Sequence, residues 1–112
     1  MKKKLLGLLV ISMLLLLAIQ PAFAGSRTYS HGMEDYRCMG SISSTTTESS
    51  MRIKMSVSFY DGGTGWFYDE GNFNQSFFKL RSSSVRFRHG QSYCNYYVNG
   101  SNTHNSIAPW VF

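Results

Sequence analysis

The 112-residue sequence contains none of the motifs that mark common hydrolases and nucleotide-binding enzymes. It has no G-x-S-x-G nucleophile elbow, no phosphate-binding P-loop and no pair of carboxylates at a spacing suited to acid–base catalysis. Its three histidines, His31, His89 and His104, lack the spacing of a zinc site. We therefore expect no metal and no cofactor, and the sequence gives an enzymatic function little support.

Cysteine is scarce as well. Cys38 and Cys94 are the only two, and neither belongs to a C-x-x-C pair, which argues against a redox-active or metal-binding thiol. An exported chain meets oxidising conditions, under which two cysteines usually pair. We therefore expect a disulfide between Cys38 and Cys94, which would contribute on the order of 4 kcal/mol by restricting the unfolded chain.

The longest apolar run lies near the N-terminus and is too short to cross a membrane. Three lysines precede the run Leu5–Ile19, which falls short of the roughly 18 to 20 residues of a spanning helix, and an A-x-A pattern ends at Ala24. This arrangement is typical of a bacterial secretory signal peptide. We expect residues 1–24 to be cleaved off after Ala24, leaving residues 25–112 as one secreted, extracellular domain without a membrane span.

A strong net charge is missing once this leader is set aside. The full sequence has 11 Lys and Arg and 6 Asp and Glu. Three of the lysines lie in the leader, so eight basic residues against six acidic ones leave the mature part at about +2. A nucleic-acid-binding protein usually carries a larger and more clustered excess, which argues against nucleic acid as the partner.

The mature part does contain apolar and polar residues that alternate with a period of two. From Met51 to Phe59, apolar side chains alternate with polar and cationic ones, which predicts a strand with one buried face. The segment Asp61–Gly65 favours a turn and Trp66–Tyr68 starts another strand, so a hairpin is expected. The dipeptide Asn99-Gly100 predicts a second hairpin, whose partner strand begins near Ser101.

Four further segments have strand character: Tyr36–Thr46, Ser76–Arg81, Ser84–His89 and Ser92–Val98. We expect Gly25–Ser30 to be a loose tail, and the mature part shows no convincing helical period. The sequence therefore predicts an all-β fold, a small antiparallel β-sandwich or open barrel of about five to seven short strands with one disulfide.

Cations recur at alternate positions on two predicted strands. Arg52 and Lys54 lie on the outer face of one strand, and Arg86 and Arg88 have the same spacing on another. If the two strands are neighbours, four like charges share a face, and an anionic ligand would relieve their repulsion. The alternative is that these charges only keep the face in solution and protect an edge strand from aggregation.

Tyrosines line the predicted strand Ser92–Val98. Alternation places Tyr93 and Tyr97 on the face opposite Cys94, so burial of the cysteine would expose both rings. Exposed flat rings beside amide side chains suit the binding of a sugar or of a protein. The alternative is ordinary packing of tyrosines across a half-buried sheet.

Three functions are compatible with these features. The preferred hypothesis is a small secreted binding protein that acts through its surface on a cell-envelope polymer, a glycan or another protein. The four cations would serve an anionic partner and the two tyrosines would stack on a ligand. The first alternative is a secreted antimicrobial or toxin-like protein. The second is a small hydrolase or nuclease, which would need His89 or His104 to meet a second titratable group in a cleft.

Overall fold

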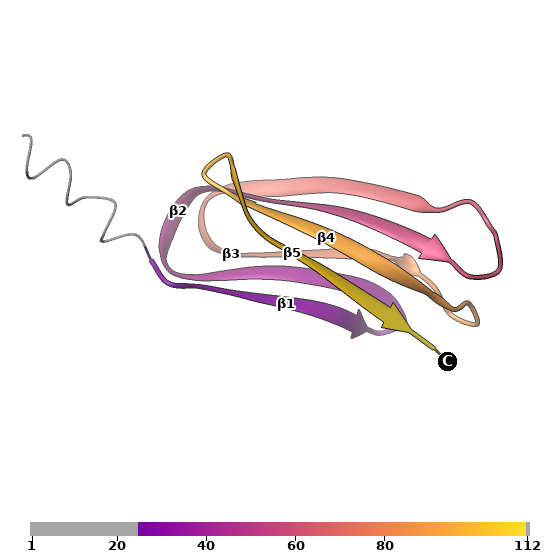
Figure 1. The fold of residues 1–112 in the computed structure, drawn as a ribbon. Coiled ribbons are helices and arrows are strands. Elements are labelled where there is room, and N and C mark those ends of the chain that lie inside the picture. Colours follow the sequence, from indigo (N-terminus) through magenta and orange to yellow (C-terminus); the bar gives the residue numbers. More distant parts are fainter. Residues whose placement is uncertain (1–24, 112) are drawn as a thin grey trace, which may run out of the picture.

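The computed structural model describes residues 25–111, and within that range it contains strands and no helix. Five antiparallel strands form one sheet that curls into a half-barrel (Figure 1). The strands are β1 (Arg27–Glu34), β2 (Arg37–Phe59), β3 (Trp66–Ser84), β4 (Gly90–Val98) and β5 (Ser101–Trp110). The predicted all-β class is confirmed.

β2 is the strand on which the others assemble. β3 runs along one of its edges, from the pair Arg37 and Ser84 to the pair Val57 and Trp66. The other edge is shared, because β1 pairs with the first half of β2 and β4 pairs with the second half. β5 then pairs with β4 and completes the sheet.

The ribbon formed by β2 and β3 bends back on itself near its middle, and this bend curls the sheet. The β2–β3 register shifts between Ser43 and Glu48, an irregularity of the kind that bends a strand. Figure 1 shows the two halves of the ribbon facing each other, one with β1 and the other with β4 and β5. The first and last strands meet across the interior, where Tyr29 Oη donates a hydrogen bond of 2.6 Å to Thr103 Oγ1.

The core lies between the two halves and is built from alternate positions of the strands, as the period of two requires. Each large side chain removed from water there stabilises the fold by roughly 1.5–3 kcal/mol. The buried hydrophobic residues are Cys38, Ile42, Met51, Ile53, Met55, Val57, Phe59, Leu80, Val85, Cys94, Tyr96, Val98 and Trp110.

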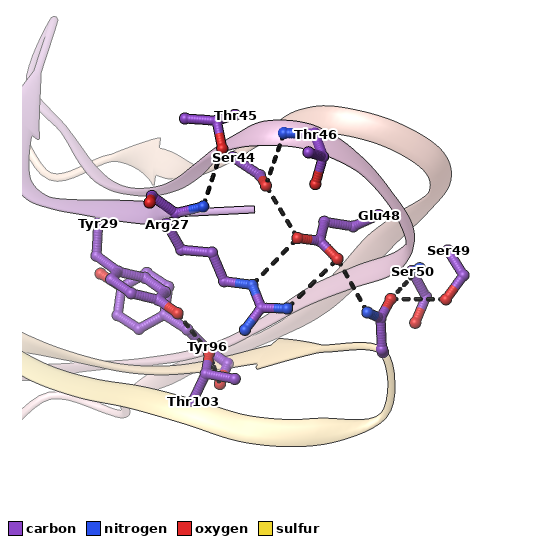
Figure 2. Close-up of polar contacts among 12 residues, drawn as sticks. Arg27, Tyr29, Ser44, Thr45, Thr46, Glu48, Ser49, Ser50, Tyr96 and Thr103 are labelled. Atoms are coloured by element: carbon purple, nitrogen blue, oxygen red, sulfur yellow. Dashed lines mark hydrogen bonds and ion pairs between the residues drawn. The ribbon is translucent and has the colours of Figure 1, made fainter. Parts of the chain in front are cut away.

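A buried carboxylate ties the bend to its surroundings (Figure 2). Glu48 is only 4% exposed, yet it accepts hydrogen bonds from Arg27 of β1 at 3.2 and 3.4 Å, from Ser44 at 2.9 Å and from the Asn99 side chain at 2.9 Å. Burial alone would raise the pKa of Glu48, but these hydrogen bonds outweigh it and the pKa is lowered. The carboxylate therefore stays charged and joins three elements at the bend.

The predicted turns and strands are partly confirmed. Asn99 and Gly100 both have positive φ, 52° and 84°, as a two-residue hairpin turn requires, and β5 starts at Ser101. The segments expected as separate short strands fuse into the long β2 and β3, because the bulge bends the strand without ending it. The prediction of a loose tail over residues 25–30 is wrong from Arg27 onward, since Arg27 starts β1 and donates a hydrogen bond to Glu48.

The strand predicted over Ser84–His89 is also wrong. β3 ends at Ser84, and a tight turn follows in which the Arg88 N–H donates to the Val85 carbonyl over 3.0 Å. Phe87 lies in this turn with a φ of 67°, and its side chain is 81% exposed.

The predicted disulfide is not present, and the two cysteines are free thiols. Both side chains are buried, but they enter the core from different halves of the sheet. Cys38 pairs with Met33 in the β1–β2 half, whereas Cys94 pairs with Met55 in the β2–β4 half. Sharing one core therefore does not place the two sulfur atoms at bonding distance.

The expected signal peptide, residues 1–24, lies outside the described residues. Within residues 25–111, no helix is long and apolar enough to cross a membrane.

Replacement of Glu48 by Gln should destabilise the fold by about 2 kcal/mol, because Arg27 loses its charged partner at a site shielded from water. Urea unfolding at neutral pH measures the effect. The stabilisation by Glu48 is present above the carboxyl's unfolded pKa and is lost as the pH falls through its lower folded pKa, so the gap between variant and wild type should close in acid. The exposed Glu70→Gln is the matched control, and an equal loss in both variants would contradict this role for Glu48.

Candidate functional site

The outer face of the sheet formed by β3, β2 and β4 brings together four of the six predicted binding residues. Arg52 lies opposite Tyr97, Lys54 lies opposite Asn95, and Ser56 lies opposite Tyr93. The residues between them, such as Ile53, Met55 and Cys94, are buried on the other face. Arg52, Lys54, Tyr93 and Tyr97 therefore share one outward surface, because β2 pairs with β4 in this register.

A groove of about 460 Å³ crosses this surface where β2, β3 and β4 meet near the bend. Its lining includes Arg52, Asp69, Gly71, Asn72, Phe73 and Tyr97. Gly71 contributes no side chain to the groove, and a Cβ atom there would collide with the Met51 carbonyl oxygen, because the β3 backbone lies close against β2 at this point. The Phe73 ring is 75% exposed at the rim, and the half-buried Tyr97 ring lies across β2 from it. We call this feature the Gly71 groove.

The charges beside the Gly71 groove are balanced. The Arg52 guanidinium donates two hydrogen bonds to Asp69, of 2.5 and 2.6 Å. The hydrogen bond from Arg52 lowers the pKa of the Asp69 carboxyl, so both groups are charged at neutral pH. The Lys54 ammonium lies 5.2 Å from the centre of the Tyr97 ring. The groove thus offers hydrogen-bond donors and acceptors side by side rather than a single strong charge.

Asn72, at the edge of the groove, has one polar atom without a partner within the described residues. Its Nδ2 donates to the Phe77 carbonyl over 2.9 Å, but the buried Asn72 Oδ1 accepts no hydrogen bond. An acceptor left unpaired in this way costs about 1–3 kcal/mol. Because Asn72 lies opposite the buried Met51, this oxygen is on the inner side of the sheet and adds no contact to the outer groove.

Arg86 and Arg88 lie elsewhere, in the turn between β3 and β4. Arg88 makes two hydrogen bonds to Asp61 and its guanidinium stacks 3.5 Å from the centre of the Phe59 ring. Phe59 is the last residue of β2, about 23 Å from Arg52 at roughly 3.3 Å per strand residue. The four cations therefore do not form one patch, because the turn replaces the strand that was expected to carry Arg86 and Arg88.

A chain of polar side chains inside the half-barrel escaped the sequence analysis. Tyr96 Oη donates to the Ser30 carbonyl over 3.1 Å, so its oxygen accepts from Ser106 over 3.0 Å. The Ser106 oxygen then accepts from His31 Nδ1 over 2.7 Å. His31 Nε2 is left to accept from the buried Ser92 over 2.6 Å. These bonds fix one neutral tautomer of His31 and tie β1 to β4 and β5.

The interior thiols next to this chain are not nucleophiles. Cys94 Sγ lies 3.5 Å from His31 Nε2, but burial raises the pKa of Cys94 to about 12, and burial likewise raises the pKa of Cys38. Within residues 25–111, His, Cys, Asp and Glu side chains form no group of three that could hold a metal. His104, considered for catalysis, stacks on Tyr29 with ring centres 4.5 Å apart.

Comparison of the chain with protein-family models, with curated protein sequences and with solved structures returned no match. The geometry of the chain's own residues is therefore the basis for assigning a function.

The two thiols should react only after unfolding. In native protein at pH 7.5, Cys38 and Cys94 should resist a thiol reagent for hours, because both are buried and both thiol pKa values are raised. In denaturant without reductant, both should react at once. Mass spectrometry of the labelled protein gives the number of modified cysteines, and an unfolded chain that takes up no label would show a disulfide after all.

Stability should decrease below about pH 6.5 because of His31. Burial lowers the pKa of His31 in the folded state. Below the pKa of His31 in the unfolded chain, the unfolded state therefore binds more protons than the folded state. The free energy of unfolding then falls with pH until the pH is below the folded pKa as well. Urea unfolding between pH 8 and pH 5 should show this decrease in wild type and a flatter profile in His31→Gln. His104→Gln keeps His31 and should keep the decrease. Identical profiles in both variants would refute the assignment to His31.

Proposed function

We propose that this protein is a small secreted binding protein and that its Gly71 groove recognises a carbohydrate of the cell envelope. The observation that carries the proposal is the grouping of two aromatic rings, Phe73 and Tyr97, with the paired charges of Arg52 and Asp69 around a floor without a side chain.

This grouping matches the chemistry of a sugar ring. A sugar presents C–H groups on its faces, which pack on aromatic rings, and hydroxyl groups around its rim, which both donate and accept hydrogen bonds. Arg52 supplies donors and Asp69 supplies acceptors next to each other. The groove volume of about 460 Å³ falls in the range of small-ligand sites.

The paired charges favour a neutral carbohydrate over an anionic polymer. Arg52 already has Asp69 as its counterion, so an anionic ligand would have to compete with that carboxylate.

Binding of purified protein, made from the full 112-residue chain, to soluble neutral cell-wall polysaccharide tests the proposal by calorimetry. Tyr97→Ala should weaken binding about tenfold, since stacking on an aromatic ring is worth roughly 0.5–1.5 kcal/mol. Tyr60→Ala is the matched control, because Tyr60 is 60% exposed and directly follows Phe59, the last residue of β2, away from the groove.

The variant Asp69→Asn distinguishes a neutral carbohydrate ligand from an anionic polymer. With a neutral ligand this variant should weaken binding, because the acceptor charge and the position of Arg52 are lost. Tighter binding in Asp69→Asn, together with strong weakening by salt in wild type, would identify an anionic polymer instead. Equal affinities of the Tyr97 and Tyr60 variants would overturn the assignment to the groove.

A further inference from the structure

The turn between β3 and β4 presents an aromatic ring in a backbone conformation that disfavours it. Phe87 has a φ of 67°, in the left-handed region normally taken by glycine, and its side chain is 81% exposed. A bulky residue in that region is strained, and such strain persists where the surrounding structure maintains it, often at functional sites. Because the ring buries little surface within the chain, its packing does not explain its presence.

A second aromatic turn lies directly beside the first. Asp35 and Tyr36, which connect β1 to β2, also have positive φ, 51° and 59°, and the Tyr36 side chain is 47% exposed. The Val85 N–H donates a hydrogen bond of 2.7 Å to the Tyr36 carbonyl, which locks the two turns together. Figure 1 shows both turns at the end of the molecule that also carries the C-terminus, opposite the β2–β3 bend.

A cation lies between the two rings. The Arg86 guanidinium is 5.2 Å from the centre of the Tyr36 ring and 4.9 Å from the centre of the Phe87 ring. Arg37 follows Tyr36 and is exposed as well. Tyr36, Arg37, Arg86 and Phe87 form what we call the aromatic tip.

The aromatic tip and the ion pairs next to it carry the positive excess of the described residues. Lys79 and Arg81 pair with Glu34 at the end of β1, and Arg88 pairs with Asp61. Together with Asp35, Arg37 and Arg86 these groups carry five positive and three negative charges, whereas Arg27, Arg52 and Lys54 are balanced by Glu48, Asp69 and Glu70. The exposed aromatic rings of the tip therefore lie in surroundings with a small positive charge.

We propose that the aromatic tip docks on an anionic lipid surface and inserts the Phe87 ring among the headgroups. Aromatic rings favour the interface between water and hydrocarbon, and basic side chains near an anionic membrane are attracted to it. The turns are held by backbone hydrogen bonds, so the rings are already oriented before contact. Docking here keeps the Gly71 groove, which lies near the β2–β3 bend at the opposite end of the molecule, away from the membrane.

Co-sedimentation of the purified protein, made from the full 112-residue chain, with vesicles tests the proposal. One vesicle set contains phosphatidylcholine with about one third phosphatidylglycerol, and the other contains phosphatidylcholine alone. We expect binding to the anionic set that weakens with salt, and at least tenfold less binding to the neutral set.

Phe87→Gly is the decisive variant because glycine fits a φ of 67° without strain. It should bind anionic vesicles at least tenfold less than wild type, while its unfolding midpoint in urea does not fall. Phe73→Ala removes a ring of similar exposure, 75%, beside the Gly71 groove and should bind vesicles as wild type does. Arg86→Gln should weaken binding and reduce its dependence on salt.

Absence of binding to anionic vesicles at low salt, or equal binding by Phe87→Gly and wild type, would overturn the proposal. Such a result would leave a protein partner as the remaining occupant of the aromatic tip. Because the carbohydrate experiment uses soluble polysaccharide and different variants, the two proposals can fail independently.

Discussion

The curl of the sheet depends on the ionised carboxylate of Glu48, which is held where water barely reaches it. Removing a carboxylate from water is costly unless its oxygens receive enough hydrogen bonds. Here the donors come from β1, from the bulge of β2 and from the turn between β4 and β5 (Figure 2). The carboxylate is satisfied only when all three have assembled, so this polar requirement selects one arrangement among those that hydrophobic packing alone would allow.

The curled sheet separates an interior of hydrogen-bonded side chains from an outer surface that carries the two proposed recognition sites. Inside, His31, Ser92, Ser106 and Tyr96 satisfy one another, and the thiols stay protonated. Outside, the Gly71 groove lies near the bend in the middle of β2, whereas the aromatic tip lies at the end of the molecule where β2 begins. The fold therefore keeps the two proposed recognition surfaces apart.

The sequence was sufficient for much of the local structure. Alternation along Met51–Phe59 and Ser92–Val98 correctly gave the buried and exposed faces, and Asn99-Gly100 correctly gave a hairpin turn, because these signals depend only on neighbours in the chain. The continuity of β2 was not predicted, since the polar residues 47–50 separate the two strands expected over Tyr36–Thr46 and Met51–Phe59. Its partners, Arg27 and Asn99, are distant in sequence and become visible only in the fold.

The candidate site shows the same limit. The outward direction of Arg52 and of Tyr97 followed from alternation along each strand. That the two lie side by side depends on the pairing of β2 with β4, and the ion pair of Arg52 with Asp69 depends on the register between β2 and β3. Likewise, Arg86 and Arg88 have the spacing of outward residues on a strand. The structure places them in a turn instead, closed by the hydrogen bond from Arg88 to Val85. The prediction of a disulfide was wrong for a related reason. An oxidising compartment and an even number of cysteines do not fix the distance between two sulfur atoms.

The contact between β1 and β5 has a consequence for how the chain folds. It joins the first and last strands, through Tyr29 with Thr103 and His31 with Ser106, so the interior cannot close until the whole domain is available. Topologies dominated by such distant pairings fold slowly, since loop-closure entropy is lost before the contacts are gained. A chain exported in the unfolded state would gain from that delay, because its core would stay open until synthesis and translocation were complete.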